Sequence, residues 1–318
     1  MALRPIGPTI DGELGWFAVS LRSWIQASRP PSQLYIFLPL LVGQSFCVME
    51  GHVLDWGRFA LIHLFGLFIQ LFIVYANDVG DRDTDLLNRT HTIFSGGSRV
   101  LAEAKISLHS LRLASVLMAA MTMASALLTA LLSGRYLAPV LGGLGLALLY
   151  MYSFSPFRIS YRGGGELLQT AGVGVILPLY GYYGQCGGLT GFPLEMLGVM
   201  LPTELACAVA TALPDAPSDR RSEKRTAVVL LGSSLAQVMI IALNLLSIAA
   251  FCLLFNQRLS TGAMLGLLAA PVAATLLLAV GRGGRPGERR LSMFVGAAIT
   301  STLTLFGALS ALPLVLGR

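Results

Sequence analysis

Residues 58–85 read RFALIHLFGLFIQLFIVYANDVGDRDTD. After Arg58 this stretch carries no Asp, Glu, Lys or Arg until Asp78, and it then carries four aspartates in eight positions. About 20 predominantly apolar residues allow an α-helix to cross the hydrocarbon core of a bilayer, where charged residues are costly and rare. The stretch therefore predicts a membrane-spanning helix that ends in an acidic cluster at one membrane face.

The rest of the chain has the same character. Of its 318 residues, 55% are hydrophobic and 12% are charged, with a mean hydropathy of +0.72, whereas soluble domains carry about 25% charged residues. This composition predicts an all-α polytopic membrane protein with nine transmembrane helices. The predicted spans are 32–49, 58–77, 108–132, 137–154, 166–183, 192–213, 227–255, 261–280 and 291–316. We expect residues 1–31 to form an N-terminal interfacial segment and residues 32–318 to form a single transmembrane domain.

The basic residues are distributed unequally between the two faces that these spans define. Of the 22 Lys and Arg residues, 18 fall on the face that holds the N-terminus and the loops after spans 2, 4, 6 and 8. The other four are Arg58, Arg135, Arg258 and Arg318. Cytoplasmic loops of membrane proteins are enriched in Lys and Arg, so the N-terminus is predicted to be cytoplasmic and the C-terminus to lie on the opposite side. The same distribution explains the basic pI of about 9.4 without a nucleic-acid partner.

Two acidic clusters follow spans 2 and 6. The first, in residues 77–85, contains Asn77, Asp78, Asp81 and Asp85, and the three aspartates share one helical face if the helix continues. The second, in residues 215–219, repeats the four-residue spacing with Asp215 and Asp219. Because an even number of spans separates them, both clusters are predicted to face the cytoplasm, where their loops form a cap over a central cavity. Mg²⁺ prefers such oxygen ligands and usually takes one or two carboxylates together with substrate phosphate.

These two motifs resemble the signature motifs of the UbiA superfamily of intramembrane prenyltransferases. Residues 94–101 (FSGGSRVL) and 161–166 (YRGGGE) look most like the branch that contains 1,4-dihydroxy-2-naphthoate prenyltransferases, and Arg29-Pro30 and Tyr152-Ser153 resemble further family features. The resemblance implies Mg²⁺-dependent transfer of a prenyl group from a polyprenyl diphosphate to a small aromatic acceptor in the membrane, such as a quinone precursor. One feature departs from that branch, which often has Asn shortly before the second motif, where this chain has residues 211–214 (TALP).

The resemblance also implies roles for individual residues. Asp78, Asp81 and Asp85, with Asn77, are expected to bind one Mg²⁺, and Asp215 and Asp219 a second; these five aspartates are the expected catalytic residues. Candidates for binding the diphosphate are Lys105, Arg158, Lys224 and Arg225, although each also fits the charge bias of a cytoplasmic loop. Tyr152 is expected to stabilise a cationic intermediate through its aromatic face. Glu166 and Gln169 open the predicted span 166–183, and either one contacts the acceptor or stabilises a helix N-terminus.

Several other residues carry weaker expectations. The four cysteines show no CxxC spacing, so neither a zinc site nor a disulfide is expected. Tyr180, Tyr182 and Tyr183 are interpreted as interfacial aromatic residues. Residues 95–99 either hold phosphate with backbone N–H groups or form a flexible linker. Glu204 lies within a predicted span, where it lines the cavity or forms a structural pair.

Three alternatives to a prenyltransferase remain at this level. A transporter would distribute ionisable residues along a path through the spans, whereas here they concentrate in two loops. A CDP-alcohol phosphatidyltransferase would gather its aspartates in one stretch instead of two distant ones. A UbiA-type terpene cyclase would share the metal site without a separate acceptor. No obligate protein partner is indicated.

Overall fold

The computed structural model describes residues 20–317, and every regular element in this range is a helix. The expected interfacial segment therefore lies largely outside the described residues, apart from helix α1 (Leu21–Ser28) at its end. The longer helices are α2 (Leu34–Met49), α3 (Trp56–Gly80), α5 (Leu108–Ser133), α6 (Ala138–Ser153), α9 (Leu197–Ala212), α12 (Ser233–Phe255), α13 (Thr261–Gly281) and α14 (Arg289–Val315). The shorter ones are α4 (Arg82–Leu87), α7 (Gly165–Ala171), α8 (Leu177–Cys186), α10 (Ala216–Arg221) and α11 (Ala227–Leu231).

The helices confirm a multi-pass membrane protein. Seven helical segments in the described range are long and apolar enough to cross a membrane, with α1 and α2 counted together as Leu21–Met49. Helix α6 is apolar but shorter. The predicted span 166–183 corresponds to α7 and α8 joined by a π-helical turn at Gly172–Ile176, and the span 227–255 is divided at Gly232. The count of nine spans therefore stays a prediction.

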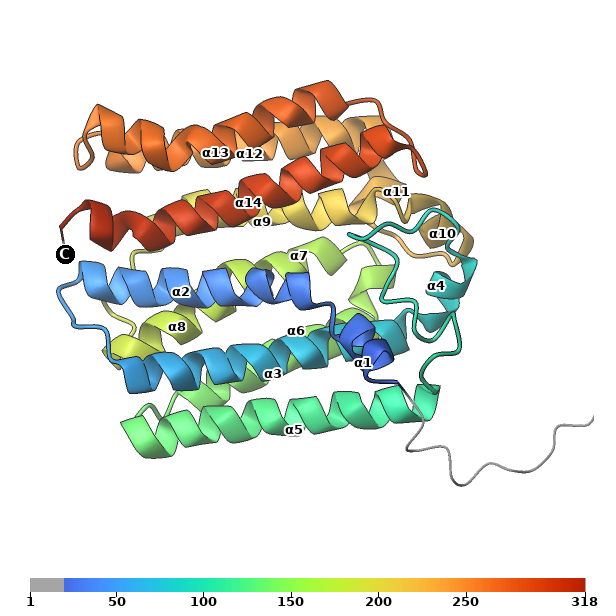
Figure 1. Cartoon of the computed structure of the whole chain (residues 1–318), viewed down its shortest axis with the longest axis horizontal. Coiled ribbons are helices and arrows are strands. Elements are labelled where there is room, and N and C mark those ends of the chain that lie inside the picture. The colour runs from blue at the N-terminus through green and yellow to red at the C-terminus, as the bar shows by residue number, and fades with distance from the viewer. Residues whose placement is uncertain (1–19, 318) are drawn as a thin grey trace, which may run out of the picture.

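The helices lie roughly parallel to the long axis of the molecule (Figure 1). The connection between α2 and α3 and the C-terminal end of α14 lie at one end, whereas α1, α4, α10 and α11 lie at the other (Figure 1). The loops that follow α3 and α9 therefore meet at the same end of the bundle, although more than 100 residues separate them in the sequence.

Helices α2 and α8 approach each other closely because glycine replaces larger side chains at their contact. A Cβ atom on Gly43 would lie 2.0 Å from the carbonyl oxygen of Pro178, and one on Gly181 would lie 2.1 Å from that of Leu40. Small residues at such crossings allow backbones to pack together in membrane bundles. These glycines therefore set the position of α8 beside α2.

The tyrosines of α8 correct the expectation of an interfacial aromatic belt. Tyr180, Tyr182 and Tyr183 are all buried within the bundle. The Tyr180 ring stacks on Phe65 of α3 with a centroid separation of 3.8 Å, and the Tyr183 hydroxyl accepts a hydrogen bond from the Leu137 amide at 3.0 Å. A tyrosine near the end of a span has the same sequence pattern whether it lies at the membrane interface or in the core. Only the packing of α8 distinguishes the two cases.

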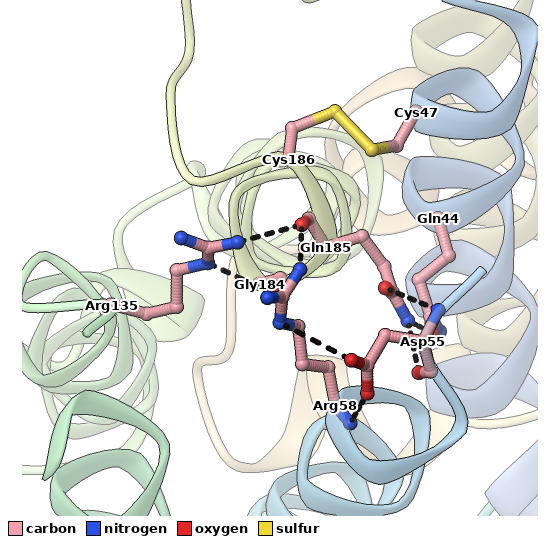
Figure 2. The surroundings of a disulfide bond; sticks show 8 residues. All are labelled: Gln44, Cys47, Asp55, Arg58, Arg135, Gly184, Gln185 and Cys186. Carbon is pink, nitrogen blue, oxygen red and sulfur yellow. Dashed lines mark hydrogen bonds and ion pairs between the residues drawn. A yellow bond between two sulfur atoms is a disulfide. The ribbon is translucent and has the colours of Figure 1, made fainter. Parts of the chain in front are cut away.

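A disulfide joins Cys47 at the end of α2 to Cys186 at the end of α8, so the expectation of no disulfide was wrong (Figure 2). The two cysteines lie 139 residues apart, and no spacing rule connects them. Polar contacts surround the bond: the Gln185 side chain donates to Gln44 Oε1 at 3.1 Å, and Arg58 and Arg135 donate to the Gln185 carbonyl at 3.0 and 2.9 Å (Figure 2). This end of the bundle is therefore tied together covalently and by hydrogen bonds.

Candidate functional site

A cavity of about 320 Å³ lies among α2, α3, α6, α7, α8 and α9. One part of its lining is polar and includes Asn77, Asp81, Asp85, Asn88, Asp215, Asp219 and Lys224. Another part is apolar and includes Ile36, Ile69, Ile73, Leu148, Leu149, Val173, Ile176 and Leu177. A single cavity thus offers a charged region next to a hydrocarbon-like region, as a ligand with an ionic head and an apolar tail requires.

The first acidic motif does not form one continuous helical face. Helix α3 ends at Gly80, Asp81 leaves the helical conformation with φ −98° and ψ 10°, and α4 then begins at Arg82. Asp81 lines the cavity and accepts hydrogen bonds from Asn77 Nδ2 at 3.0 Å and from the Tyr161 hydroxyl at 3.2 Å. Asp85 also lines the cavity. The bend therefore directs the carboxylates of Asp81 and Asp85 to the cavity. Asp78, which precedes the bend, no longer shares a helical face with them.

Asp78 has different surroundings from the other motif aspartates. Its side chain is buried, pairs with Arg29, and accepts hydrogen bonds from the amide (3.1 Å) and the hydroxyl of Ser98. It is not among the residues that line the cavity. The structure therefore places Asp78 as an anchor for the segment before α2 and for the loop around Ser98. Arg29 had been singled out only through the family resemblance.

The second motif is held by residues from the first. Asp215 accepts hydrogen bonds from Asn88 Nδ2 at 2.7 Å and from the Gly96 amide at 3.0 Å. Thr90 donates to the Pro214 carbonyl at 2.7 Å. Asn88, which no sequence signal indicated, therefore holds Asp215 with its side-chain amide.

A lysine connects the two motifs directly. Lys224 is buried, and its Nζ lies 2.8 Å from Asp81 Oδ2 across 143 positions of sequence. Lys224 Nζ also lies 5.8 Å from the ring centroid of Tyr152 and 5.6 Å from that of Tyr161. The two clusters thus share one chamber, with a cation between them.

The loop of residues 95–99 packs against both motifs and is therefore not a free linker; its residues Ser95, Gly96 and Gly97 line the cavity. Gly96 and Gly97 adopt φ angles of +79° and +68°, which glycine allows at little cost. These angles direct the Gly96 amide to Asp215 and the Ser98 amide to Asp78. A Cβ on Gly97 would lie 2.2 Å from Asp85 Oδ2, so the close approach of the loop also requires glycine.

Burial and mutual repulsion shift the protonation of the carboxylates. Burial, together with the neighbouring Asp81 and Asp78, raises the pKa of Asp85 to about 8. Burial and the nearby Asp215 raise the pKa of Asp219 to about 7, although Lys224 opposes the shift. Burial alone would lower the pKa of Lys224, but Asp81, Tyr152 and Asp219 raise it well above its usual range. The chamber therefore contains more acidic side chains than positive charges to balance them.

Of the four cations expected to bind diphosphate, Lys224 lines the cavity and the other three do not. Lys105 pairs with Glu103 at 2.5 Å and donates to Gln26 Oε1 at 2.8 Å. Arg158 lies over the Tyr161 ring, 3.9 Å from its centroid, and Arg225 is exposed. Three of these basic residues therefore fit the charge bias of the loops better than a ligand contact.

Tyr152 and Glu166 both line the cavity. Glu166 Oε1 accepts a hydrogen bond from the Ala227 amide at 2.7 Å, at the start of α11. A carboxylate at this position stabilises the helix N-terminus. Tyr161 was not among the predicted site residues, yet its hydroxyl contacts both Asp81 and Thr84.

The donor set fits a hard divalent cation. Four aspartates line one chamber, their side chains offer only oxygen ligands, and two of them have strongly raised pKa values that a dication would lower. In the described residues, three potential ligand atoms lie within 4.8 Å of one another only at Cys47, His52 and Cys186, where the disulfide occupies both sulfurs. The aspartates are more widely spaced, which suits Mg²⁺ ions that take one or two carboxylates each and complete their coordination with phosphate and water.

Two curated proteins resemble this chain in sequence. The chain is 28% identical over 305 residues to a 1,4-dihydroxy-2-naphthoate octaprenyltransferase of Mycobacterium tuberculosis, covering 92% of this chain and 99% of the relative. It is 27% identical over 219 residues to a 2-carboxy-1,4-naphthoquinone phytyltransferase of Synechocystis, covering 67% of each chain.

Solved structures share the fold. A UbiA homolog from Aeropyrum pernix superimposes with a TM-score of 0.67 at 16% identity, covering 88% of this chain and 98% of that one. A UbiA homolog from Archaeoglobus fulgidus, solved with DMAPP and Mg²⁺, gives 0.64 at 17% identity, covering 88% and 99%. The model of the UbiA prenyltransferase family matches residues 36–315. The chain therefore belongs to the UbiA prenyltransferase family.

Proposed function

We propose that the protein transfers a prenyl group from a polyprenyl diphosphate to a hydroxylated aromatic acceptor, such as 1,4-dihydroxy-2-naphthoate, in a Mg²⁺-dependent reaction. The observation that carries the proposal is the single cavity in which four aspartates and Lys224 adjoin an apolar region. The charged region suits a metal-bound diphosphate, and the apolar region suits the prenyl chain. The M. tuberculosis relative, named as a naphthoate octaprenyltransferase, supports the choice of acceptor.

Asp81 and Asp85 are proposed to hold one Mg²⁺, and Asp215 and Asp219 a second. Asp78 is proposed to hold Arg29 and the loop at Ser98 in place beside them. Mg²⁺, when bound, neutralises the negative charge that collects on the departing diphosphate. Lys224 is placed to bind a diphosphate oxygen, because its Nζ already lies among these carboxylates. Asn88 and the Gly96 amide hold Asp215 in orientation.

The reaction breaks the bond between prenyl C1 and the diphosphate oxygen, and the electron pair leaves with the diphosphate. An aromatic carbon of the acceptor then forms a bond to C1 and releases the H⁺ or CO₂ that it carried. The ring of Tyr152 faces the same chamber and stabilises the allylic cation by about 0.5–2 kcal/mol. The apolar lining excludes water, which would otherwise react with the cation.

The acidic end of the bundle is proposed to face the cytoplasm. The unequal distribution of Lys and Arg supports this orientation. The disulfide supports it independently, because it lies near the end where α2 joins α3 and disulfides persist on the oxidising side of a membrane. The variants Arg225→Cys and Arg258→Cys test the orientation. Each is made in a background without Cys207 and Cys252, so that the new cysteine is the one free thiol beside the Cys47–Cys186 disulfide. In right-side-out vesicles an impermeant maleimide is expected to label only the second variant, and the reverse result contradicts the orientation.

The function is tested with purified protein in lipid nanodiscs. Labelled prenyl diphosphates of several lengths and a panel of aromatic acceptors are supplied with Mg²⁺, and prenylated product and released diphosphate are measured. We expect turnover to be lost with EDTA, restored by Mg²⁺, and abolished by Asp81→Ala and Asp215→Ala. Asp83→Ala is the matched control, because Asp83 is exposed in the same motif and does not line the cavity. Wild-type turnover in the first two variants would rule out the proposed site.

A further inference from the structure

A buried pair of polar side chains adjoins the cavity and has no part in the chemistry above. Gln169 of α7 lines the cavity, and its Nε2 donates a hydrogen bond to Glu204 Oε1 of α9 at 3.3 Å. Glu204 is fully buried, and α9 is one of the candidate membrane spans. An ionisable side chain at such a position is costly and usually serves a function.

The pair has unused capacity to accept hydrogen bonds. Glu204 Oε2 is buried without a partner among the described residues, and it is the one carboxylate oxygen of which this is true there. Gln169 Oε1 has no hydrogen bond to any described residue, because the amide presents its nitrogen to Glu204. The hydrogen bond to Glu204 Oε1 holds the Gln169 amide with its nitrogen toward α9. The cavity wall therefore offers an oriented carbonyl oxygen to a ligand that carries a donor.

The local backbone holds the pair in place. Directly after α7, the π-helical turn Gly172–Ile176 directs Gly172, Val173 and Ile176 to the cavity lining. Gly174 of this turn packs against α9, where an added Cβ would lie 3.1 Å from Leu201 Cδ2 and 3.9 Å from Glu204 Cβ. Turns of this kind occur often at functional sites.

Gln169 is also at the appropriate depth. It follows Glu166 by three residues, about 4.5 Å along the helix axis, and Glu166 contacts the start of α11 close to Lys224 in the sequence. The side chain thus lies about one turn from the charged region and borders the apolar residues Val173 and Ile176. In the proposed reaction the acceptor ring lies where the diphosphate gives way to the first prenyl carbon, and Gln169 lies at this boundary between the charged and apolar lining.

We propose that Gln169 binds a hydroxyl group of the aromatic acceptor and that Glu204 is a positioning residue that orients the Gln169 amide. The assignment rests on the proposed function and adds the orientation of the acceptor. A prenyl chain has no donor to offer this site, whereas a phenolic hydroxyl has one.

The test separates ligand recognition from a structural link between α7 and α9. KM values for acceptor and for prenyl diphosphate are measured separately in nanodiscs for Gln169→Leu, Glu204→Leu and Glu204→Gln. We expect Gln169→Leu and Glu204→Leu to raise the acceptor KM about tenfold or more, with the KM for prenyl diphosphate changed by less than about twofold. Glu204→Gln restores most of the affinity, because its carbonyl still accepts from Gln169.

Thr203→Val is the matched control. It removes a buried hydroxyl next to Glu204 that bonds to Thr302 of α14 at 3.2 Å, so it perturbs the same helix without touching the cavity pair. We expect no selective change in acceptor KM. An acceptor analogue that lacks the bound hydroxyl should lose about tenfold or more in kcat/KM with the wild type, but no more than about twofold with Gln169→Leu.

The outcomes distinguish the two proposals. If the wild type prenylates an acceptor but Gln169→Leu raises both KM values equally, or discriminates the analogue as the wild type does, then the pair is structural and this inference is wrong. If the wild type yields no prenylated product with any acceptor, the proposed function fails and this inference fails with it.

Discussion

Gly97→Ala offers a sharp test of the site, because the chain contains a nearly ideal control. Gly97 and Gly134 share a φ of +68°, so alanine strains the backbone equally at both, by about 1–2 kcal/mol. They differ in their surroundings. A Cβ on Gly97 would lie 2.2 Å from Asp85 Oδ2 and 3.1 Å from Asp78 Oδ1, whereas a Cβ on Gly134 would have no atom within 4 Å.

The expected magnitude follows from these distances. Ordinary van der Waals contact begins at 3.4 Å, so the Asp85 carboxylate must move by about 1 Å to admit the methyl group. Because the contacted atom is the end of a side chain, rotation can relieve the contact and the cost in stability stays close to that of Gly134→Ala. A displacement of about 1 Å in a positioned catalytic group reduces the rate by about 100-fold.

The assay compares kcat/KM, the Mg²⁺ concentration for half-maximal rate, and the Tm of both variants in nanodiscs. We expect Gly97→Ala to lose about 100-fold in kcat/KM and to require more Mg²⁺, while Gly134→Ala stays within about twofold of the wild type. Similar Tm values for the two variants would show that the loss is local. If Gly97→Ala retains wild-type kcat/KM and Mg²⁺ dependence, Asp85 is not a metal ligand and the reasoning is refuted.

Three further predictions concern charge, pH and the disulfide. Lys224→Met is expected to destabilise the metal-free protein by about 3 kcal/mol, because Asp81 stays buried without its cation. In a double-mutant cycle, adding Asp81→Asn to this variant should recover part of the lost stability. Additive effects of the two substitutions would contradict the pairing. The folded protein holds protons on Asp85 and Asp219, with pKa values of about 8 and 7, after unfolded carboxyls have lost theirs. The metal-free Tm should therefore fall as the pH rises from about 4 to about 8, and Mg²⁺ should reverse the fall most strongly at the upper end. The control is Asp85→Asn/Asp219→Asn, which should show a smaller fall, because burial also raises the pKa of Asp215; an equal fall in that variant contradicts the assignment. Cys47→Ser is expected to lower the stability by about 2–4 kcal/mol, measured with and without reductant, whereas the free Cys252 should tolerate the same change; equal effects would argue against the bond.

The sequence predicted the membrane character and the site region because both depend on properties that can be read along the chain. Hydropathy over about 20 residues identifies a span, and the segment 58–77 lies within α3 as observed. The even number of spans between Asp81 and Asp215 requires both to reach the same end of the bundle, where Lys224 and Asn88 now connect the two motifs. The family resemblance was confirmed by the match over residues 36–315.

The prediction was less accurate for individual side chains. Asp78 has the same residue type and helical spacing as its neighbours, yet the bend at Asp81 leaves it against Arg29 and Ser98, and it is not among the residues that line the cavity. Lys105 and Lys224 were equal candidates for the diphosphate, but only the latter reaches the chamber. Asn88 carries no motif signal, because its partner Asp215 lies 127 residues away.

The sequence by itself determined a polytopic helical protein with two acidic clusters at one end. The length of each apolar segment identifies a span, and each span moves the chain to the opposite side of the membrane, so both properties can be read by counting along the chain. What only the tertiary structure decided is which atoms meet: the Asn88–Asp215 and Lys224–Asp81 contacts, the Gln169–Glu204 pair and the Cys47–Cys186 bond. Such contacts depend on the rotation, tilt and separation of helices. These are set by packing details, such as the glycine contacts between α2 and α8, that involve residues far apart in sequence.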